Sequence, residues 1–337
     1  MKLAHFIGLI IAALLAVILG TGLLSTQQGE QSFEHQTLIQ HFDFDTLHRV
    51  KIEGKGYKVE LIKHLLSWQV TELYGYAANT EQLSDLLQTL KTIEIQEYKT
   101  SNSKNYHRLG LTDVELDGAD SIQLTLVNDE SEVIVLLGNE ANTGTGQYAK
   151  LASSAQTYLL NNRVKVKTNP KDWLEQRILP YAFDEIRQLN WLDNEGAAFS
   201  IERKEQVVTG ELKVDKGQVV LPTGEMNLKP DFELILPEGE HQLMYQSVFT
   251  GLVRNTNQLE LEAVIPLSAF NTSELEPIYT IELSAEQNGV RQTSLLSFYQ
   301  DLSGQHWVVR KGLSWAYQIS EFSFKQLAKP VQEYLAE

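Results

Sequence analysis

Two glutamates spaced by one residue are the first candidates for acid–base chemistry in this sequence. Glu260 and Glu262 fall on a stretch predicted to be a strand, where residues i and i+2 share one face. Paired carboxylates act as acid and base only when a cleft raises the pKa of one of them. A solvated strand face needs no such cleft. We therefore expect a solvated strand face and no catalytic residue here.

Three histidines near the N-terminus raise the question of a metal site. His35, His41 and His48 accompany Asp43 and Asp45, but successive histidines are six and seven residues apart. Compact ligand pairs such as His-x-x-x-His have a shorter spacing. We expect solvated or capping side chains and no metal.

Glycine and serine motifs do not indicate a cofactor or a nucleophile. Residues 142–147 read Asn-Thr-Gly-Thr-Gly-Gln between predicted strands, whereas a phosphate-binding loop needs Gly-Lys-Ser/Thr at the start of a helix. Ser67, Ser294 and Ser297 lack both a Gly-x-Ser-x-Gly elbow and a local base. We expect a turn, no cofactor and no enzyme, with an envelope hydrolase as the weakest alternative.

The tryptophans fit two interpretations. Each one lies near a predicted strand or helix, where a large ring fills a small core between a sheet and a helix, but exposed rings could instead line a ligand groove. The five are Trp68, Trp173, Trp191, Trp307 and Trp315. Both interpretations stay open at this point.

An apolar run from Leu3 to Leu24 predicts a membrane anchor. Phe6–Leu24 carries no charge and would span about 28 Å as a helix, close to the thickness of a hydrocarbon core. A signal peptide has a shorter core followed by a small-x-small site. Gly20-Thr21-Gly22 is the candidate for cleavage, but the length of the run favours a retained anchor.

The anchor also predicts topology and a contact. Lys2 precedes it and 27–40 lacks Lys and Arg, so the positive-inside rule predicts a single-pass protein of the bacterial inner membrane with its N-terminus in the cytoplasm and its bulk in the periplasm. Gly8, Ala12 and Ala16 recur every four residues, a pattern that lets another transmembrane helix approach closely. Passive tethering is the alternative.

Composition limits the remaining function classes. With 28 basic and 44 acidic residues, the formal net charge of −16 disfavours nucleic-acid binding. The chain has no cysteine, which excludes disulfides and thiolate ligands. Its 337 residues suffice for two cores of about 150 residues each.

Local patterns predict a chain of strands with few helices. Alternating residues on either side of Gly54-Lys55-Gly56 predict a hairpin, and Thr80 is the expected N-cap of a helix over 81–90. Further strands are expected at 68–70, 122–127, 133–137, 148–151, 157–160, 186–191 and 198–202, and further helices at 171–178, 243–253 and 324–335.

The two halves of the chain have similar patterns. Leu136-Leu137 corresponds to Leu295-Leu296, Tyr148 to Trp307 and Tyr158 to Tyr317, each at an offset of 159 residues. Duplication is one explanation, and chance alignment of β-rich patterns is the other. The predicted fold class is α+β: a transmembrane anchor (1–26), a linker (27–44) and two tandem, mainly antiparallel sheet-plus-helix domains (45–180 and 181–337).

An ordered set of short motifs within 50–190 resembles the bacterial envelope family catalogued as domain of unknown function 4340. The motifs are Trp68-Gln-Val, the leucine-rich helix Leu83–Leu90, Leu109-Gly110-Leu111, Leu136-Leu137-Gly138, Tyr148-Ala-Lys-Leu, Tyr158-Leu-Leu, Asp172-Trp-Leu, Arg177-Ile-Leu and Asp184-Glu-Ile-Arg. Similar proteins accompany gliding-motility-type ABC transporters. The resemblance implies an accessory subunit and no catalytic residue, and the second half of the chain departs from the motif set.

Together with the predicted anchor, the resemblance implies a non-catalytic periplasmic accessory subunit of an ABC transporter for export or envelope remodelling. Its expected partners are the permease, the ATPase and a related extracytoplasmic subunit, contacted as a scaffold through the anchor and through sheet edges. The alternative is a stand-alone module that binds a glycan or a peptide.

Overall fold

The computed structural model describes residues 36–142, 144–196, 198–204, 213–215, 218–220, 232–235, 248–270 and 275–334. The predicted anchor with Gly8, Ala12 and Ala16 therefore lies outside the described residues, as does His35. Among the helices that are described, none has the length and apolar character needed to cross a membrane.

The chain forms two compact units. The first contains residues up to Thr46 together with Leu86–Lys165, and the second contains Leu47–Asp85 together with Val166–Glu337. The predicted domain boundary near residue 180 stays a prediction.

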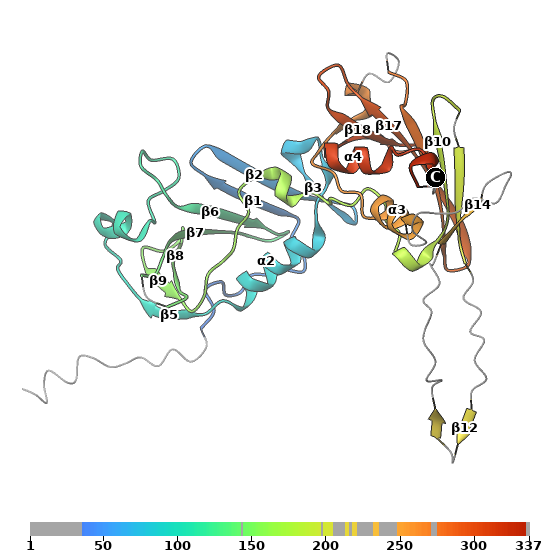
Figure 1. Cartoon of the computed structure of the whole chain (residues 1–337). Coiled ribbons are helices and arrows are strands. Elements are labelled where there is room, and N and C mark those ends of the chain that lie inside the picture. Colours follow the sequence, from blue (N-terminus) through green and yellow to red (C-terminus); the bar gives the residue numbers. More distant parts are fainter. Residues whose placement is uncertain are drawn as a thin grey trace, which may run out of the picture. The chain divides into compact units, whose positions relative to one another are not determined.

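The described residues are mainly antiparallel sheet with few helices, as the sequence predicts (Figure 1). One sheet has the strand order β4-β3-β2-β1-β6-β7-β8-β9-β5. Its strands are β1 (Arg49–Gly54), β2 (Tyr57–His64), β3 (Ser67–Val70), β4 (Tyr76–Ala77), β5 (Ile95–Tyr98), β6 (Ile122–Val127), β7 (Glu132–Glu140), β8 (Gln147–Leu151) and β9 (Thr157–Leu160).

The predicted β1–β2 hairpin is confirmed. Gly54 pairs with Tyr57, and Gly56 adopts φ +79° in the turn, a conformation that glycine accepts without a steric penalty. Val50 and Ile52 of β1 are fully buried while Lys51 between them is half-buried, as expected for strands with one face in the core.

Helix α2 (Thr80–Thr92) buries Leu83, Leu86 and Leu90, the face that the leucine spacing predicts. The predicted N-cap is wrong by one residue. Thr80 lies inside the helix, and the side chain of Asn79 accepts a hydrogen bond from the backbone N–H of Gln82 at 2.9 Å. Asparagine and threonine both cap helices, so residue type alone does not decide which of two neighbours does so.

The other large sheet has the order β14-β11-β10-β16-β17-β18-β19-β15. Its strands are β10 (Ile186–Asp193), β11 (Ala198–Arg203), β14 (Phe232–Ile235), β15 (Ala263–Pro266), β16 (Tyr279–Gln287), β17 (Val290–Gln300), β18 (His306–Arg310) and β19 (Trp315–Ile319). Strands β12 (Lys213–Asp215) and β13 (Gln218–Val220) form a separate pair.

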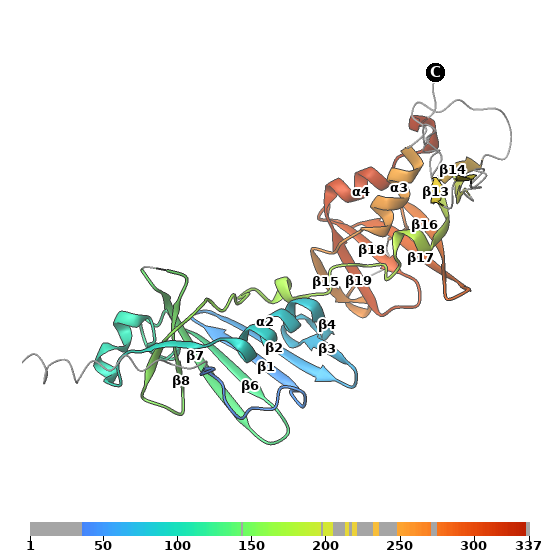
Figure 2. The same cartoon turned by 90° about the horizontal axis from the view of Figure 1, so that it is seen from below.

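A row of aromatic rings forms the core of this second sheet. Trp191 stacks on Phe199 at 5.2 Å and lies 5.9 Å from Tyr279, which stacks on Phe298 at 4.3 Å, so the row crosses β11, β10, β16 and β17. Helices α3 (Val248–Asn257) and α4 (Glu321–Leu327) lie against this sheet (Figure 2). The ring of Phe249 in α3 lies 6.1 Å from Phe199, and that of Phe324 in α4 lies 5.2 Å from Tyr279, so both helices pack on the row. The indole N–H of Trp191 donates to the carbonyl of Leu327 at 2.8 Å, which fixes the end of α4.

Short 3-10 helices complete the secondary structure: η1 (Thr71–Leu73), η2 (Ser103–Leu109), η3 (Pro170–Trp173), η4 (Phe183–Glu185), η5 (Leu267–Ala269) and η7 (Val331–Tyr334). The predicted helix over 171–178 is wrong beyond Trp173. Leu174 pairs with Ala78 and Arg177 with Glu260, so strand-like hydrogen bonds to distant segments replace helical ones.

The two other predicted helices have different bounds. Helix α3 begins at Val248, and the earlier part of the predicted 243–253 span lies outside the described residues. Helix α4 ends at Leu327 instead of running from 324 to 335, because Pro330 lacks an N–H and disfavours helical backbone at the residue before it.

Seven strands occur in the same order in both sheets: β2-β1-β6-β7-β8-β9-β5 in one and β11-β10-β16-β17-β18-β19-β15 in the other. The registers also agree at the 159-residue offset. Ile122 pairs with Leu137 and Ile281 with Leu296, while Ala149 pairs with Tyr158 and Val308 with Tyr317. In each sheet a helix, α2 or α3, directly precedes the final strand in this order.

Candidate functional site

A pocket among the described residues of the second unit contains both glutamates that the sequence singled out. It has a volume of about 380 Å³, within the usual range for small-ligand sites. The residues that line it are Asn169, Lys171, Asp172, Gln176, Glu260, Leu261, Glu262, Ser320 and Ser323.

Backbone pairing between two non-adjacent segments forms the wall of this polar pocket. The N–H of Ile178 donates to Leu259 at 3.1 Å and that of Leu261 donates to Gln176 at 2.9 Å. Strand β15 begins at Ala263, so Glu260 and Glu262 precede it. The prediction that both glutamates lie on a strand is wrong. Leu261 between them is buried and both glutamates are exposed, so the expectation that they share one solvated side is confirmed.

The chemistry of the polar pocket suits hydrogen bonding better than proton transfer. Three carboxylates, one ammonium group, two amides and two hydroxyls line it, and the carboxylates of Asp172, Glu260 and Glu262 are all exposed. Exposed carboxylates keep the hydration that a catalytic acid must lose. Within the described residues, no three His, Asp or Glu side chains are arranged to hold a metal ion.

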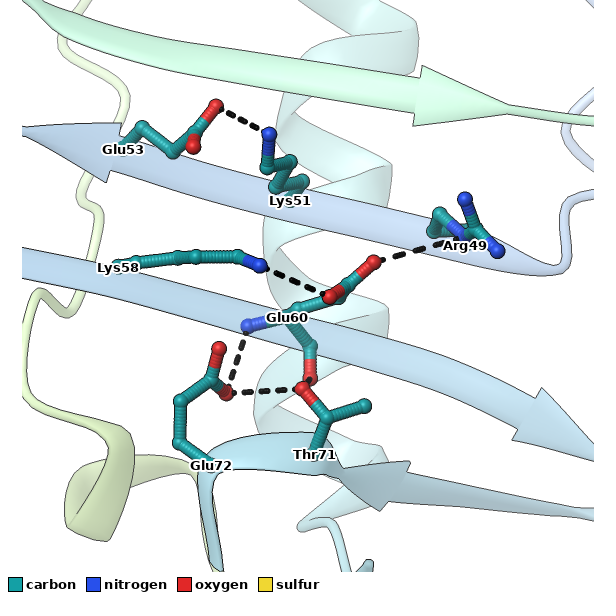
Figure 3. A network of polar contacts seen from close by, with 7 residues as sticks. All are labelled: Arg49, Lys51, Glu53, Lys58, Glu60, Thr71 and Glu72. Atoms are coloured by element: carbon teal, nitrogen blue, oxygen red, sulfur yellow. Dashed lines mark hydrogen bonds and ion pairs between the residues drawn. The ribbon is translucent and has the colours of Figure 1, made fainter.

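Charged side chains cover the outer face of β1 and β2 with a network of contacts (Figure 3). Glu60 is its centre, since its carboxylate lies 3.6 Å from Arg49 and 3.1 Å from Lys58, and its backbone N–H donates to Glu72 at 2.9 Å. Lys51 pairs with Glu53 at 2.8 Å beside it. In Figure 3 a helix runs behind the strands, so this charged face points away from the packed one.

An aromatic cluster in the second unit surrounds Tyr76. Its ring meets Trp315 edge-to-face at 5.1 Å and Tyr317 at 6.1 Å. Burial raises the pKa of Tyr76, and the neighbouring Tyr317 raises it further through its charge and through a hydrogen bond between the two side chains. Arg310 lies 6.0 Å from the ring of Tyr181 and donates to the carbonyl of Ile178 at 3.3 Å. Tyr76 and Tyr317 are both buried in this cluster, so their rings serve packing.

Two of the glycine motifs contact each other in the first unit. A Cβ on Gly138 of β7 would collide with the carbonyl oxygen of Leu109, and a Cβ on Gly110 would meet the backbone N of Asn139 at 2.8 Å. Gly110 also adopts φ +67°. The loop 109–111 therefore packs closely on β7, a relationship that the sequence motifs alone did not predict.

Three tryptophans favour the core interpretation. Trp173, Trp191 and Trp307 are buried, and their indole N–H groups donate to Lys167, Leu327 and Asp301 at 2.8–2.9 Å. Trp68 and Trp315 are half-buried.

The remaining chemical candidates are separate from one another. The described histidines His41 and His48 join no metal cluster, and Asp43 caps its own turn through Asp45 and Thr46. The loop 142–147 connects β7 to β8 as predicted, with residue 143 outside the described residues. Ser294 bonds to the hydroxyl of Tyr181 at 2.8 Å, and Ser67 donates to the carbonyl of His64 at 3.3 Å.

Comparison with known proteins gives one match. The family model described as domain of unknown function (DUF4340) matches residues 68–279, more than half of the chain. No curated protein and no solved structure matches the chain.

Proposed function

The chain belongs to the family described as domain of unknown function (DUF4340), and from this premise we propose a non-catalytic, membrane-anchored accessory subunit of an ABC transporter for export or envelope remodelling. The resemblance of its motifs to proteins that accompany such transporters supports the assignment. The apolar run Leu3–Leu24 supports attachment to the inner membrane, with the bulk of the chain in the periplasm.

The repeated strand order is the observation that carries the proposal. Seven strands follow one another identically in both sheets, with two registers conserved at the same offset, which supports duplication of one sheet-plus-helix module. A duplicated module presents two related surfaces on one chain. Within the described order, β5 and β15 are end strands in equivalent positions, and end strands can pair with a strand of another subunit.

The proposed mechanism is scaffolding. The small residues Gly8, Ala12 and Ala16 would let a permease helix approach the anchor closely, while the two modules contact the related extracytoplasmic subunit. The ATPase would be recruited through the permease.

The test is a detergent pull-down of the full-length chain. Permease and ATPase subunits should co-purify with it, and Gly8→Leu/Ala12→Leu should greatly reduce their recovery by widening the helix–helix distance. Ala13→Leu is the matched control, because it enlarges a small residue on another face of the same helix. Unchanged recovery with the double variant would reject the proposed helix contact, and absence of both subunits would reject the function.

The polar pocket favours a second candidate, a module that binds an envelope glycan or a peptide. Its carboxylates, amides and hydroxyls match a ligand rich in hydroxyl or amide groups. A fragment beginning near Gln31 should then bind glycan fragments or peptides in solution, with affinity lowered by Asp172→Asn and Glu262→Gln. No binding by the intact fragment would exclude this candidate.

A further inference from the structure

The turn between β2 and β3 exposes two consecutive leucines. His64 pairs with Ser67, so the turn consists of Leu65 and Leu66 alone. Their exposed fractions are 84% and 98%. A single exposed apolar residue is ordinary, but two adjacent leucines at the apex of a hairpin form a projecting apolar tip.

The backbone of this turn is not one that leucine favours. Leu65 adopts φ +54°, in the left-handed region that a side chain with a Cβ disfavours. Two other two-residue hairpin turns of the chain also contain positive φ angles, but there the residues are ones that tolerate them. These residues are Gly56 at φ +79°, and Asn288 and Gly289 at φ +51° and +76°. Leucine thus occupies a position where glycine would relieve the backbone strain. This indicates a role for the apolar side chain.

The residues below the tip are layered as in a membrane-interface anchor. Next to the His64–Ser67 pair, Lys63 pairs across the strands with Trp68. Lys63 and His64 are exposed, and Trp68 is half-buried. At a bilayer surface leucine enters the hydrocarbon, whereas tryptophan and lysine remain at the level of the headgroups, where the ammonium group meets phosphate.

We propose that the Leu65-Leu66 tip inserts into the phospholipid leaflet next to the periplasmic part of the chain. This contact goes beyond the proposed transporter role but rests on the proposed membrane attachment. A tip of two leucines is a weak anchor by itself. A chain already tethered to the same bilayer holds the tip at high effective concentration, so a weak contact suffices.

Because the chain contains no cysteine, one introduced thiol reports on one site. Full-length Leu66→Cys, labelled with an environment-sensitive fluorophore, is reconstituted into vesicles of phosphatidylethanolamine and phosphatidylglycerol that contain lipids with a nitroxide in the acyl chain. The matched control is Leu302→Cys, since Leu302 is also 98% exposed and lies in the turn between β17 and β18. We expect strong quenching at position 66 and little at position 302. Equal quenching at both positions would overturn the proposal.

A second variant separates apolarity from folding. Leu65→Gly/Leu66→Asn suits the positive φ and should leave the thermal midpoint unchanged or higher. With the reporter moved to Ser67→Cys, this variant should lose most of the quenching that the parent turn shows. Quenching that persists would show that the leucines do not drive insertion.

Vesicle flotation distinguishes the two proposals. Flotation of the chain without quenching at position 66 would overturn the insertion and leave the membrane attachment standing. A chain that fails to float would overturn both. Shielding of the reporter only after a membrane protein is added would assign the tip to a protein pocket and overturn the lipid contact.

Discussion

The ring of Tyr76 lies 6.1 Å from the ring of Tyr317, at an interplanar angle of 74°. Burial raises the pKa of both phenols, and the hydrogen bond between them raises that of Tyr76 while it lowers that of Tyr317. Ionisation of either phenol would place a charge in a buried aromatic cluster.

This pair predicts a loss of stability in alkali. In the unfolded chain tyrosine ionises near pH 10, and the pKa of each phenol is higher in the folded chain. The folded state therefore retains protons that the unfolded state releases, so stability is complete below about pH 10 and falls as the pH rises further. Tyr76→Phe should reduce the difference between the free energies of unfolding measured with urea at pH 8 and at pH 11. Tyr74→Phe, at a residue 61% exposed, is the control and should leave the fall unchanged.

Asp301 should organise the turn between β17 and β18. Its carboxylate accepts hydrogen bonds from the backbone N–H of Ser303 and of Gln305 at 2.9 Å and from the indole of Trp307 at 2.9 Å. Burial alone would raise the pKa of Asp301, but the hydrogen bond from the Ser303 hydroxyl at 2.6 Å, together with the three bonds above, holds it below its usual value. Its contribution to stability is therefore present above about pH 4 and is lost as the pH falls further.

Asp301→Ala should lower the free energy of unfolding by about 1–2 kcal/mol, because it leaves the indole N–H of the buried Trp307 without its acceptor. Urea unfolding at pH 7 measures the change. Asp301→Asn keeps an acceptor oxygen and should cost less. An equal loss in both variants would show that the charge, not the hydrogen bonds, matters.

The start of α2 offers a direct comparison of two neighbouring residues. Asn79→Ala should destabilise the protein by about 1 kcal/mol, since it removes the acceptor for the N–H of Gln82. Thr80→Ala places a better helix former inside the helix and should be neutral or slightly stabilising. Thermal or urea unfolding ranks the two variants, and the reverse order would restore Thr80 as the cap.

Substitution by alanine should destabilise the protein at one glycine and stabilise it at another. Gly138→Ala should lower the free energy of unfolding by about 2–4 kcal/mol, because its Cβ meets the rigid carbonyl of Leu109. Gly251 lies within α3 with open space around a Cβ, so Gly251→Ala should stabilise by about 0.5–1 kcal/mol. Chemical denaturation of both variants checks the contrast, and a mild effect at Gly138 would contradict the close approach of loop 109–111.

Sequence patterns worked best where neighbours along the chain determine the structure. The hairpin around Gly56 and the leucine face of α2 depend on local turn chemistry and on helical periodicity, and both are confirmed. The predicted helix over 171–178 was wrong because Leu174 and Arg177 hydrogen-bond to distant segments. A local pattern contains no information about such partners.

The candidate site also combines features that the sequence predicts with features that only the fold brings together. Glu260 and Glu262 were recognised from residue type and spacing, but their pocket neighbours Lys171 and Ser320 come from segments far away in the chain. The close approach of loop 109–111 to β7 at Gly138 could not be predicted for a similar reason, since a glycine motif does not show which segment approaches it.

The sequence alone determined the class of the protein: a mainly antiparallel chain with few helices, no cysteine, a net charge of −16 and the motifs of its family. Hydrophobic periodicity and composition are local properties, and they need no knowledge of neighbours in space. Only the tertiary structure decided the order of strands shared by the two sheets, the walls of the polar pocket and the strained leucine tip at Leu65. These features depend on which distant segments pair, and pairing is settled by the burial and hydrogen bonding of the whole fold.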